Sequence, residues 1–268
     1  MTPFRLLLTN DDGIYAPGLV TLANKLQEAG YPLAVVAPDR ERSSVGHALT
    51  LNRPIRLWEA ERGLYATGIR IFGCDGTPSD CVVLGMEVVD PHIDLVVSGI
   101  NRGPNLGDDL TYSGTVSAAM EGVILGKAAL ALSLNCHRSE PENHYETAAD
   151  AALKILEWLG TNTLARGTLL NVNVPNLSQE GIEGFMVTRK GLRTYEGKVT
   201  EFRNPHGALS YWIAGRPEDE MAEGTDVWAV AHGLVSITPI HMDMTHFPSI
   251  RFLKENGIES LGTGNSER

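Results

Sequence analysis

The feature that most constrains the fold is an alternation of short apolar runs with segments of helical periodicity. The run "FRLLLTN" ends in turn-forming residues, and apolar side chains then recur at helical spacing in "PGLVTLANKLQEAG", between Pro17 and Gly30. A second apolar run, "YPLAVVAP", follows. A strand, a helix of about a dozen residues and a second strand form a βαβ unit, because parallel strands need such a crossover.

The same alternation continues to about residue 175. Helices are expected over 79–89, 113–126 and 144–160, and strands over 93–101, 128–134 and 169–175. This pattern predicts an α/β fold, a Rossmann-like, doubly wound and mostly parallel sheet with helices on both faces, in three αβα layers.

The pattern changes after Gly184, where short β-like pieces alternate with Gly, Pro and charged residues. We therefore expect an α/β core over residues 1–184 and a β-rich C-terminal extension over 185–268 that returns to the core. Residues 185–215 are expected to form a protruding hairpin arm, and 254–268 a polar tail.

Composition excludes several classes of protein. The chain has 268 residues, 43% of them hydrophobic, a formal net charge of -11 and a pI of about 5.2. Nucleic acid and anionic membranes attract basic surfaces, so we expect neither as a partner. Cys74, Cys81 and Cys136 show no CxxC spacing, which argues against a disulfide framework and a structural zinc site. With no secretory or membrane-spanning run, a cytoplasmic location is expected.

Two adjacent carboxylates, Asp11 and Asp12, directly follow the first predicted strand. Taken alone, "NDDG" is more often a hydrophilic turn. However, ligands of open parallel sheets bind beyond the carboxyl ends of the strands, and the loops after two further strands carry Ser43 and Asn101. Two carboxylates, a hydroxyl and an amide form a hard oxygen set suited to one Mg²⁺ or Mn²⁺ ion.

The loop from Gly99 to Thr115 holds four glycines and ends in "YSGT". Ser113 or Thr115 can cap the following helix, and amides at a helix N-terminus can bind phosphate without a lysine. An ordinary helix cap is the alternative. His47 is the one histidine in the predicted crevice, and its role stays open between hydrogen bonding and proton transfer.

Other phosphate-transfer and hydrolase motifs are missing from the sequence. It contains no GxxxxGK[ST] loop and no HExxH zinc motif. An aspartyl nucleophile in a DxDG pattern would need an acid at position 10, where the chain has Asn10. No Gly stands two residues before Ser113, so a nucleophile elbow is also excluded.

Five stretches together resemble one known family. "NDDGIYAPG", "VVAPDRERSSVGHALTL", "GTPSDCV", "VSGINRGPNLGDDLTYSGTVSAAMEG" and "TDVWAVAHGLVSITPI" occur in order between about residues 5 and 245. This series is similar to the stationary-phase survival protein SurE family of 5'/3'-nucleotidases.

The resemblance implies a metal-dependent phosphomonoesterase that acts on nucleoside monophosphates, in some members also an exopolyphosphatase. It places the family's metal ligands on Asp11, Asp12, Ser43 and Asn101, and its phosphate-binding Ser-Gly-Thr on Ser113, Gly114 and Thr115. Asn10, Asn105 and His47 are assigned to substrate binding. It further implies a homodimer or homotetramer assembled through the C-terminal arm.

The predicted function is therefore release of phosphate from nucleoside 5'- and 3'-monophosphates, with Asp11 and Asp12 as catalytic residues. Two alternatives remain open at this point. One is a metal-dependent nucleotide sensor that does not hydrolyse its ligand, and the other is a metal hydrolase of amide or ester bonds. The preferred base, the preferred phosphate position and the general base are not decided by the residues.

Overall fold

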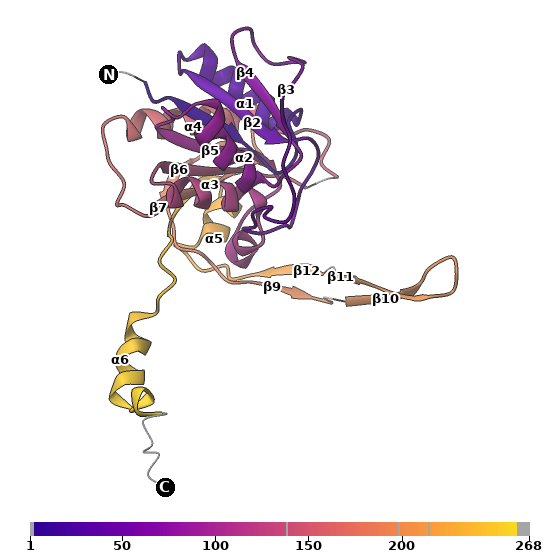
Figure 1. Cartoon of the computed structure of the whole chain (residues 1–268). Coiled ribbons are helices and arrows are strands. Elements are labelled where there is room, and N and C mark those ends of the chain that lie inside the picture. The colour runs from indigo at the N-terminus through magenta and orange to yellow at the C-terminus, as the bar shows by residue number, and fades with distance from the viewer. Residues whose placement is uncertain (1–2, 138, 198, 214, 262–268) are drawn as a thin grey trace.

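A mixed sheet runs through the body of the protein and carries helices on both faces (Figure 1). The computed structural model describes residues 3–137, 139–197, 199–213 and 215–261. Within these residues the sheet has nine strands, in the order β3-β4-β2-β1-β5-β6-β7-β13-β8. The three-layer α/β architecture predicted from the sequence is confirmed.

Parallel strands form the centre of the sheet. They are β1 (Leu6–Thr9), β2 (Leu33–Pro38), β4 (Arg70–Cys74), β5 (Leu95–Arg102), β6 (Ala128–Asn135) and β7 (Thr168–Pro175). Crossover helices join most of them: α1 (Pro17–Glu28), α2 (Pro78–Leu84) with a π-helical turn (Gly85–Val89), α3 (Gly114–Ile124) and α4 (Tyr145–Leu159). The predicted crossover pattern is therefore present.

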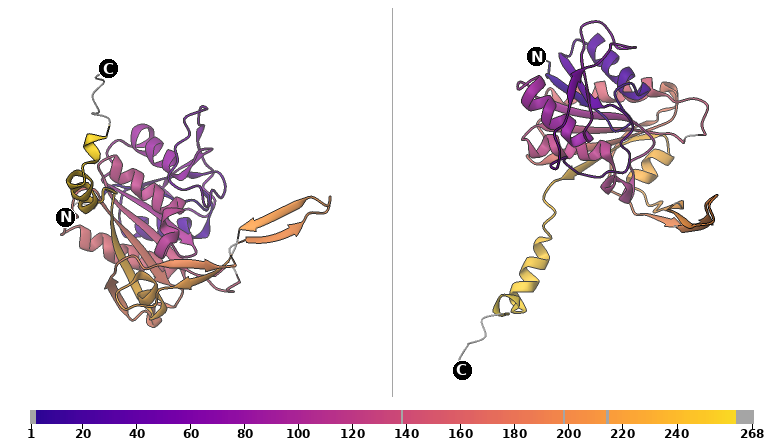
Figure 2. Two further views of the ribbon diagram at one scale, coloured as in Figure 1. Left: turned by 90° about the horizontal axis from the view of Figure 1, so that it is seen from below. Right: turned by 45° about the vertical axis from the view of Figure 1, so that its right-hand side comes forward.

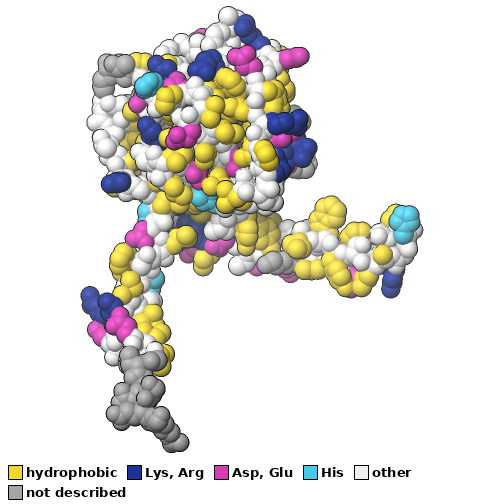
Figure 3. Space-filling view, viewed as in Figure 1, with side chains coloured by type: hydrophobic (Ala, Val, Ile, Leu, Met, Phe, Trp, Pro, Cys, Tyr) yellow, Lys and Arg dark blue, Asp and Glu magenta, His cyan; other side chains and the backbone are white. Residues whose placement is uncertain are grey.

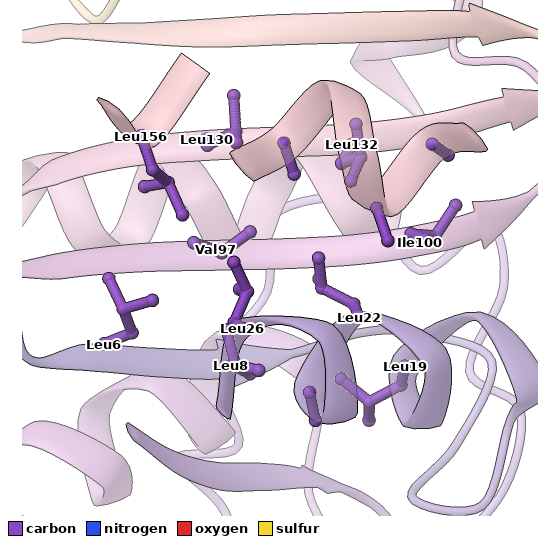
Figure 4. Packing of buried hydrophobic residues seen from close by; sticks show 14 of the residues in the cluster. Leu6, Leu8, Leu19, Leu22, Leu26, Val97, Ile100, Leu130, Leu132 and Leu156 are labelled. Carbon is purple, nitrogen blue, oxygen red and sulfur yellow. The ribbon is translucent and has the colours of Figure 1, made fainter. Parts of the chain in front are cut away.

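Both faces of the sheet are buried, which explains why its central strands are continuously apolar. On one face Leu6 and Leu8 of β1 pack with Leu19, Leu22 and Leu26 of α1 (Figure 4). Leu7, pointing the opposite way, belongs to the core beneath α2 and α3. This double burial holds the ends of β1 and β5, and the loops that follow them, in fixed positions.

The edges of the sheet differ from expectation. Residues 57–59 (β3) and 70–74 (β4) form strands that the sequence patterns did not predict.

At the opposite edge of the sheet, β13 (Leu234–His241) runs antiparallel to β7, and β8 (Gly184–Val187) runs parallel to β13. Residues 184–187 thus belong to the central sheet and not to the arm, because their backbone pairs with β13. Helix α5 (Asp226–Ala231) immediately precedes β13.

The arm is a long hairpin that projects from the body (Figures 1 and 2). Its strands are β9 (Arg193–Glu196), β10 (Val199–Arg203), β11 (Leu209–Ile213) and β12 (Arg216–Asp219), paired as β10 with β11 and β9 with β12. The arm therefore covers 193–219, where the sequence predicted 185–215.

A second projection follows β13 and ends in α6 (Phe247–Glu255) and a short 3-10 turn (Ile258–Ser260). The predicted polar tail thus begins inside a helix, and its residues 262–268 lie outside the described part of the chain. Among the helices of the described residues, none has the length and apolarity that a membrane span requires.

Candidate metal and phosphate site

The turn after β1 carries the two predicted carboxylates. Asn10 is fully buried and closes this turn on itself: its amide nitrogen donates to the Gly13 carbonyl at 3.0 Å, and its oxygen accepts from the Gly13 N–H at 3.2 Å. Gly13 has a φ of +106°, a conformation that favours glycine. Both groups of the Asn10 amide therefore hold the shape of the turn that presents Asp11 and Asp12.

Asp11 lies against the N-terminus of α3. The Thr115 hydroxyl donates to Oδ1 of Asp11 at 2.5 Å, and a Cβ on Gly114 would lie 2.7 Å from the Cβ of Asp11. Ser113 caps the same helix, its hydroxyl accepting from the Val116 N–H at 3.1 Å. Only a glycine at position 114 allows this approach, so the carboxylate and the predicted phosphate loop are in direct contact.

Asp12 lies beside the end of β5. The Arg102 N–H donates to its Oδ2 at 2.9 Å. In the preceding residue, Asn101, the amide nitrogen donates to the Gly103 carbonyl at 2.9 Å. This bond fixes the amide so that its oxygen is the atom able to bind a cation. Asp12 and Asn101 are thus neighbours because β1 and β5 are adjacent parallel strands.

The loop after β2 reaches the same turn. The Arg42 N–H donates to the main-chain carbonyl of Asp11 at 2.7 Å, which places Ser43 one residue from this contact. The exposed Ser43 hydroxyl donates to Glu41 at 2.8 Å. The turn at Asp11 and Asp12 is therefore the point at which the loop carrying Ser43, the end of β5 with Asn101 and the start of α3 with Thr115 meet.

The chemistry of these groups fits a hard divalent cation. In the described part of the chain no three carboxylate, imidazole or thiol groups gather at one point, so a cation at this turn would take hydroxyl and amide oxygens as well. Mg²⁺ and Mn²⁺ accept such mixed oxygen ligands. Ser43 and Asn101 would supply them beside Asp11 and Asp12.

Electrostatics favour a cation at this position. Burial raises the pKa of Asp11 to about 6, against the opposing effect of the Thr115 hydrogen bond, and the neighbouring charge of Asp12 raises it as well. A buried carboxylate next to a second one is costly to ionise, and a bound cation removes that conflict.

Asn105, predicted to bind substrate, is buried in a polar cluster beneath the loop. Its side-chain nitrogen donates to Ser133 at 2.7 Å, and its N–H donates to the Asn173 side chain at 2.8 Å. Asn171 and Asn173 in turn donate to its carbonyl, at 2.9 and 3.1 Å. Its hydrogen bonds therefore support the course of the loop between β5 and α3.

His47 pairs with a residue that sequence reasoning missed. Its Nε2 lies 2.8 Å from Oε2 of Glu121, which is on α3 and only 5% exposed. Arg102, whose N–H binds Asp12, was missed as well. Nothing in the local spacing marks either residue, because the partners are 74 and 90 positions apart.

Comparison with known proteins agrees with this geometry. A family model described as "Survival protein SurE" matches residues 6–197, which include every predicted metal and phosphate residue. The chain belongs to the SurE family. In a solved structure, the SurE protein from Aquifex aeolicus is 41% identical, with a TM-score of 0.81 over 94% of this chain and 99% of that one.

Two curated relatives carry names that state an activity. The 5'-nucleotidase SurE of Geobacter metallireducens is 47% identical, over 93% of this chain and 96% of the relative. The 5'/3'-nucleotidase SurE of Photorhabdus laumondii is 48% identical, over 94% and 95% respectively. The resemblance inferred from the sequence motifs is thereby confirmed.

Proposed function

We propose that this protein is a divalent-metal-dependent phosphomonoesterase that releases phosphate from nucleoside 5'- and 3'-monophosphates. The names of its relatives support the reaction and the substrate class. The observation that carries the proposal for this chain is the contact between the Asp11 carboxylate and the N-terminus of α3. That contact brings a cation-binding group and a phosphate-binding group to one point.

In this proposal Asp11, Asp12, Ser43 and Asn101 hold one Mg²⁺ or Mn²⁺ ion. When bound, the cation supplies a Lewis acid that draws charge from the phosphoryl oxygens and lowers the pKa of a water molecule. Holding that cation at the end of β1 is the task of the turn that Asn10 closes. Asp11 and Asp12 are also the two candidates for the group that orients the attacking water and accepts its proton.

The phosphoryl group is oriented by Ser113, Gly114 and Thr115. Amide N–H groups at a helix N-terminus and the dipole of α3 favour the charge that develops on the phosphoryl oxygens during attack by water. Glycine at position 114 allows this close approach. Asn105 and His47 contribute by holding the two loops on either side. Release of the nucleoside completes the reaction, and we include polyphosphate among the proposed substrates.

We further propose that the protein assembles as a homodimer or homotetramer through its arm. Support comes from the apolar side chains along the hairpin and along α6, which Figure 3 shows on both projections. Trp212 is 64% exposed and Ile213 is 77% exposed in the single chain. Large exposed apolar surfaces mark sites of protein contact. The cytoplasmic location remains a prediction from the sequence.

The deciding experiment measures phosphate release from a panel of nucleoside 5'- and 3'-monophosphates and from polyphosphate, with Mg²⁺, with Mn²⁺ and with EDTA. We expect metal-dependent release that Asp12→Asn lowers by more than about 100-fold, since it removes a charged ligand of the catalytic ion. Glu201→Gln, an exposed substitution on β10, is the matched control and should leave release unchanged.

The fold should survive Asp12→Asn, because this carboxylate stands outside the hydrophobic core. Full activity of the folded variant would refute the assigned site. Intact Mn²⁺ binding with no release from any substrate would instead favour a nucleotide sensor. Release from amides or esters only would favour the other hydrolase class.

A further inference from the structure

Glu121 is a buried carboxylate with no part in the reaction described above. It stands in the third turn of α3, a helix otherwise made mostly of small and apolar residues, and its side chain is 6% exposed. His47 Nε2 reaches it from the loop after β2, at 2.8 Å. The pair therefore joins the loop that carries Ser43 to the helix whose N-terminus carries the phosphate site.

Burial of this carboxylate needs an explanation. Removing a charge from water is unfavourable unless the charge is paired, and even a paired charge often adds less stability than an apolar side chain of similar volume would. Val116, Ala119 and Val123 of the same helix belong to the hydrophobic core, and an apolar residue at position 121 would stabilise the packing of α3 at least as well. The carboxylate is better explained by what it holds in place.

What it holds is the short loop around Ser43. On the N-terminal side of Ser43, the Arg42 N–H is bound to the Asp11 carbonyl. On the C-terminal side, the Gly46 N–H donates to the Tyr112 carbonyl at 3.3 Å, and His47 meets Glu121. Between these anchors Ser44 has a φ of +58°, which is unfavourable for a residue other than glycine and needs support from its surroundings.

We propose that the His47–Glu121 pair is a latch that positions Ser43 over the carboxylate pair. Both are positioning residues, and neither touches the substrate. The inference rests on the proposed function, because Ser43 matters as a ligand of the cation. It also gives His47 a definite task, different from the substrate binding predicted from the sequence.

The latch makes α3 the common support of both halves of the site. Gly114 and Thr115 at its start contact Asp11, and Glu121 lies seven residues, or about two turns, further along. A rigid helix thus fixes the distance between the phosphate loop and the Ser43 loop. Loss of the latch should release the Ser43 loop while the phosphate loop keeps its place.

The test compares His47→Ala, Glu121→Ala and the double variant in the full-length, metal-free protein. Amide hydrogen exchange should become at least about tenfold faster at residues 43–47, because the strained loop loses its C-terminal anchor, and should stay unchanged in β1 and α3. The two single variants and the double variant should behave alike, since each breaks the same pair. His47→Ala also covers the case in which Glu121→Ala does not fold, because the His47 side chain is 30% exposed.

Mn²⁺ affinity, measured by calorimetry, provides the second readout. His47→Ala should weaken it by about 10- to 100-fold, as loss of a ligand's support does in other metal sites. In a Ser43→Ala background, the same substitution should cause no further loss. Asp150→Asn, which breaks the Lys25–Asp150 ion pair between α1 and α4, is the matched control and should change neither readout.

Each outcome separates the latch from the proposed function. Unchanged exchange at residues 43–47 overturns the latch, while Ser43→Ala and Asp12→Asn still report on the metal site. An additive loss of Mn²⁺ affinity in the Ser43→Ala background also overturns it, because His47 would then act on the cation independently. If Asp12→Asn and Ser43→Ala both leave Mn²⁺ affinity intact, the metal site fails, and the positioning role fails with it.

Discussion

The site and the arm are held in position by different means. The turn at Asp11 and Asp12 follows strands buried on both faces, and each of its neighbouring loops is attached to it by hydrogen bonds. The arm is a two-stranded ribbon whose outer half, β10 and β11, exposes large apolar side chains. Isolated two-stranded hairpins are marginally stable in water. The comparison teaches that the core positions the site, whereas the arm is joined to the body only at its root, and we propose that a second copy of the chain covers its outer half.

The two regions meet at the root of the arm. The side chain of Arg193 is 8% exposed and donates to both oxygens of Asp219 at 2.6 and 2.8 Å and to Asp109 at 3.0 Å. Asp109 belongs to the 3-10 turn Gly107–Thr111, which leads directly to Ser113. The Tyr195 hydroxyl donates to the same carboxylate. The root of the arm is therefore bonded to the turn that leads to the phosphate site.

The largest effect is expected from breaking this root. Arg193→Met leaves two carboxylates without their buried partner, which costs about 3–5 kcal/mol. For a protein of this size, that corresponds to a Tm lower by roughly 10 °C. Arg189→Met is the matched control, because the Arg189 side chain is more than half exposed and solvent screens its ion pair with Glu220. An unchanged Tm for Arg193→Met would show that the arm opens independently of the body.

The next effect concerns the site itself. In Gly114→Ala the new methyl group would lie 2.7 Å from the Asp11 Cβ, so the phosphate loop and the carboxylate must separate. A displacement of about 1 Å is enough to lower kcat/KM by roughly 10- to 100-fold. The measurement is steady-state phosphate release by the folded variant.

Gly122→Ala, on the same helix, serves as the control for this change. Its methyl group would lie 2.8 Å from Val96 of β5, beneath the helix and away from the site. Overpacking should cost about 1–3 kcal/mol of stability, partly offset by the better helix propensity of alanine. Its kcat/KM should stay unchanged, and an equal loss of activity in both variants would contradict the assignment of the phosphate site.

The sequence predicted those features that depend on local patterns. The strand 6–9 was evident because an uninterrupted apolar run ends in turn formers. Strand β4 was missed because Arg70 and Gly73 interrupt its apolar residues. The β-like character of residues 185–187 was predicted, but they were placed in the arm because their pairing partner, β13, lies far along the chain. The residues of an edge strand show no local periodicity that identifies the strand with which they pair.

The same division holds within the site. Asp11, Asp12 and Asn101 could be grouped because they lie at the carboxyl ends of two parallel strands, a rule that needs no coordinates. Asn10 and Asn105 stand in the expected loops, but their amides hold the backbone, and only the fold reveals that. The His47–Glu121 and Arg193–Asp109 pairs join residues 74 and 84 positions apart, so no motif could indicate them.

A smaller effect on stability is expected in β11, at the end of the strand that is nearer the body. Replacing Trp212 and Ile213 by serine should change the free energy of unfolding by only about 0.5 kcal/mol, because both side chains are exposed in the single chain. The assembly should nevertheless dissociate toward monomer, as measured by sedimentation velocity. Leu64→Ser, an exposed apolar site on the body, is the control and should leave the assembly intact. An unchanged mass for the Trp212 and Ile213 variant would refute assembly through the arm.

The smallest effect tests whether charges at the rim of the site add to its rigidity. Asp75 accepts hydrogen bonds from the Arg56 N–H at 2.9 Å, from Arg56 Nε at 3.0 Å and from Arg53 at 3.2 Å. The hydrogen bonds from Arg56, that of the main-chain N–H first, hold the pKa of Asp75 below its usual range.

A carboxylate whose pKa is lowered on folding contributes stability that is complete above about pH 5. That stability is lost as the pH falls below about 4 toward the pKa of the folded state. Tm measured between about pH 7 and about pH 3 should therefore fall less steeply for Asp75→Asn than for the parent protein, whereas Glu201→Gln on the arm should follow the parent curve. Parallel curves for all three proteins would mean that the site loops owe their position to the core and to their main-chain hydrogen bonds, without help from these arginines.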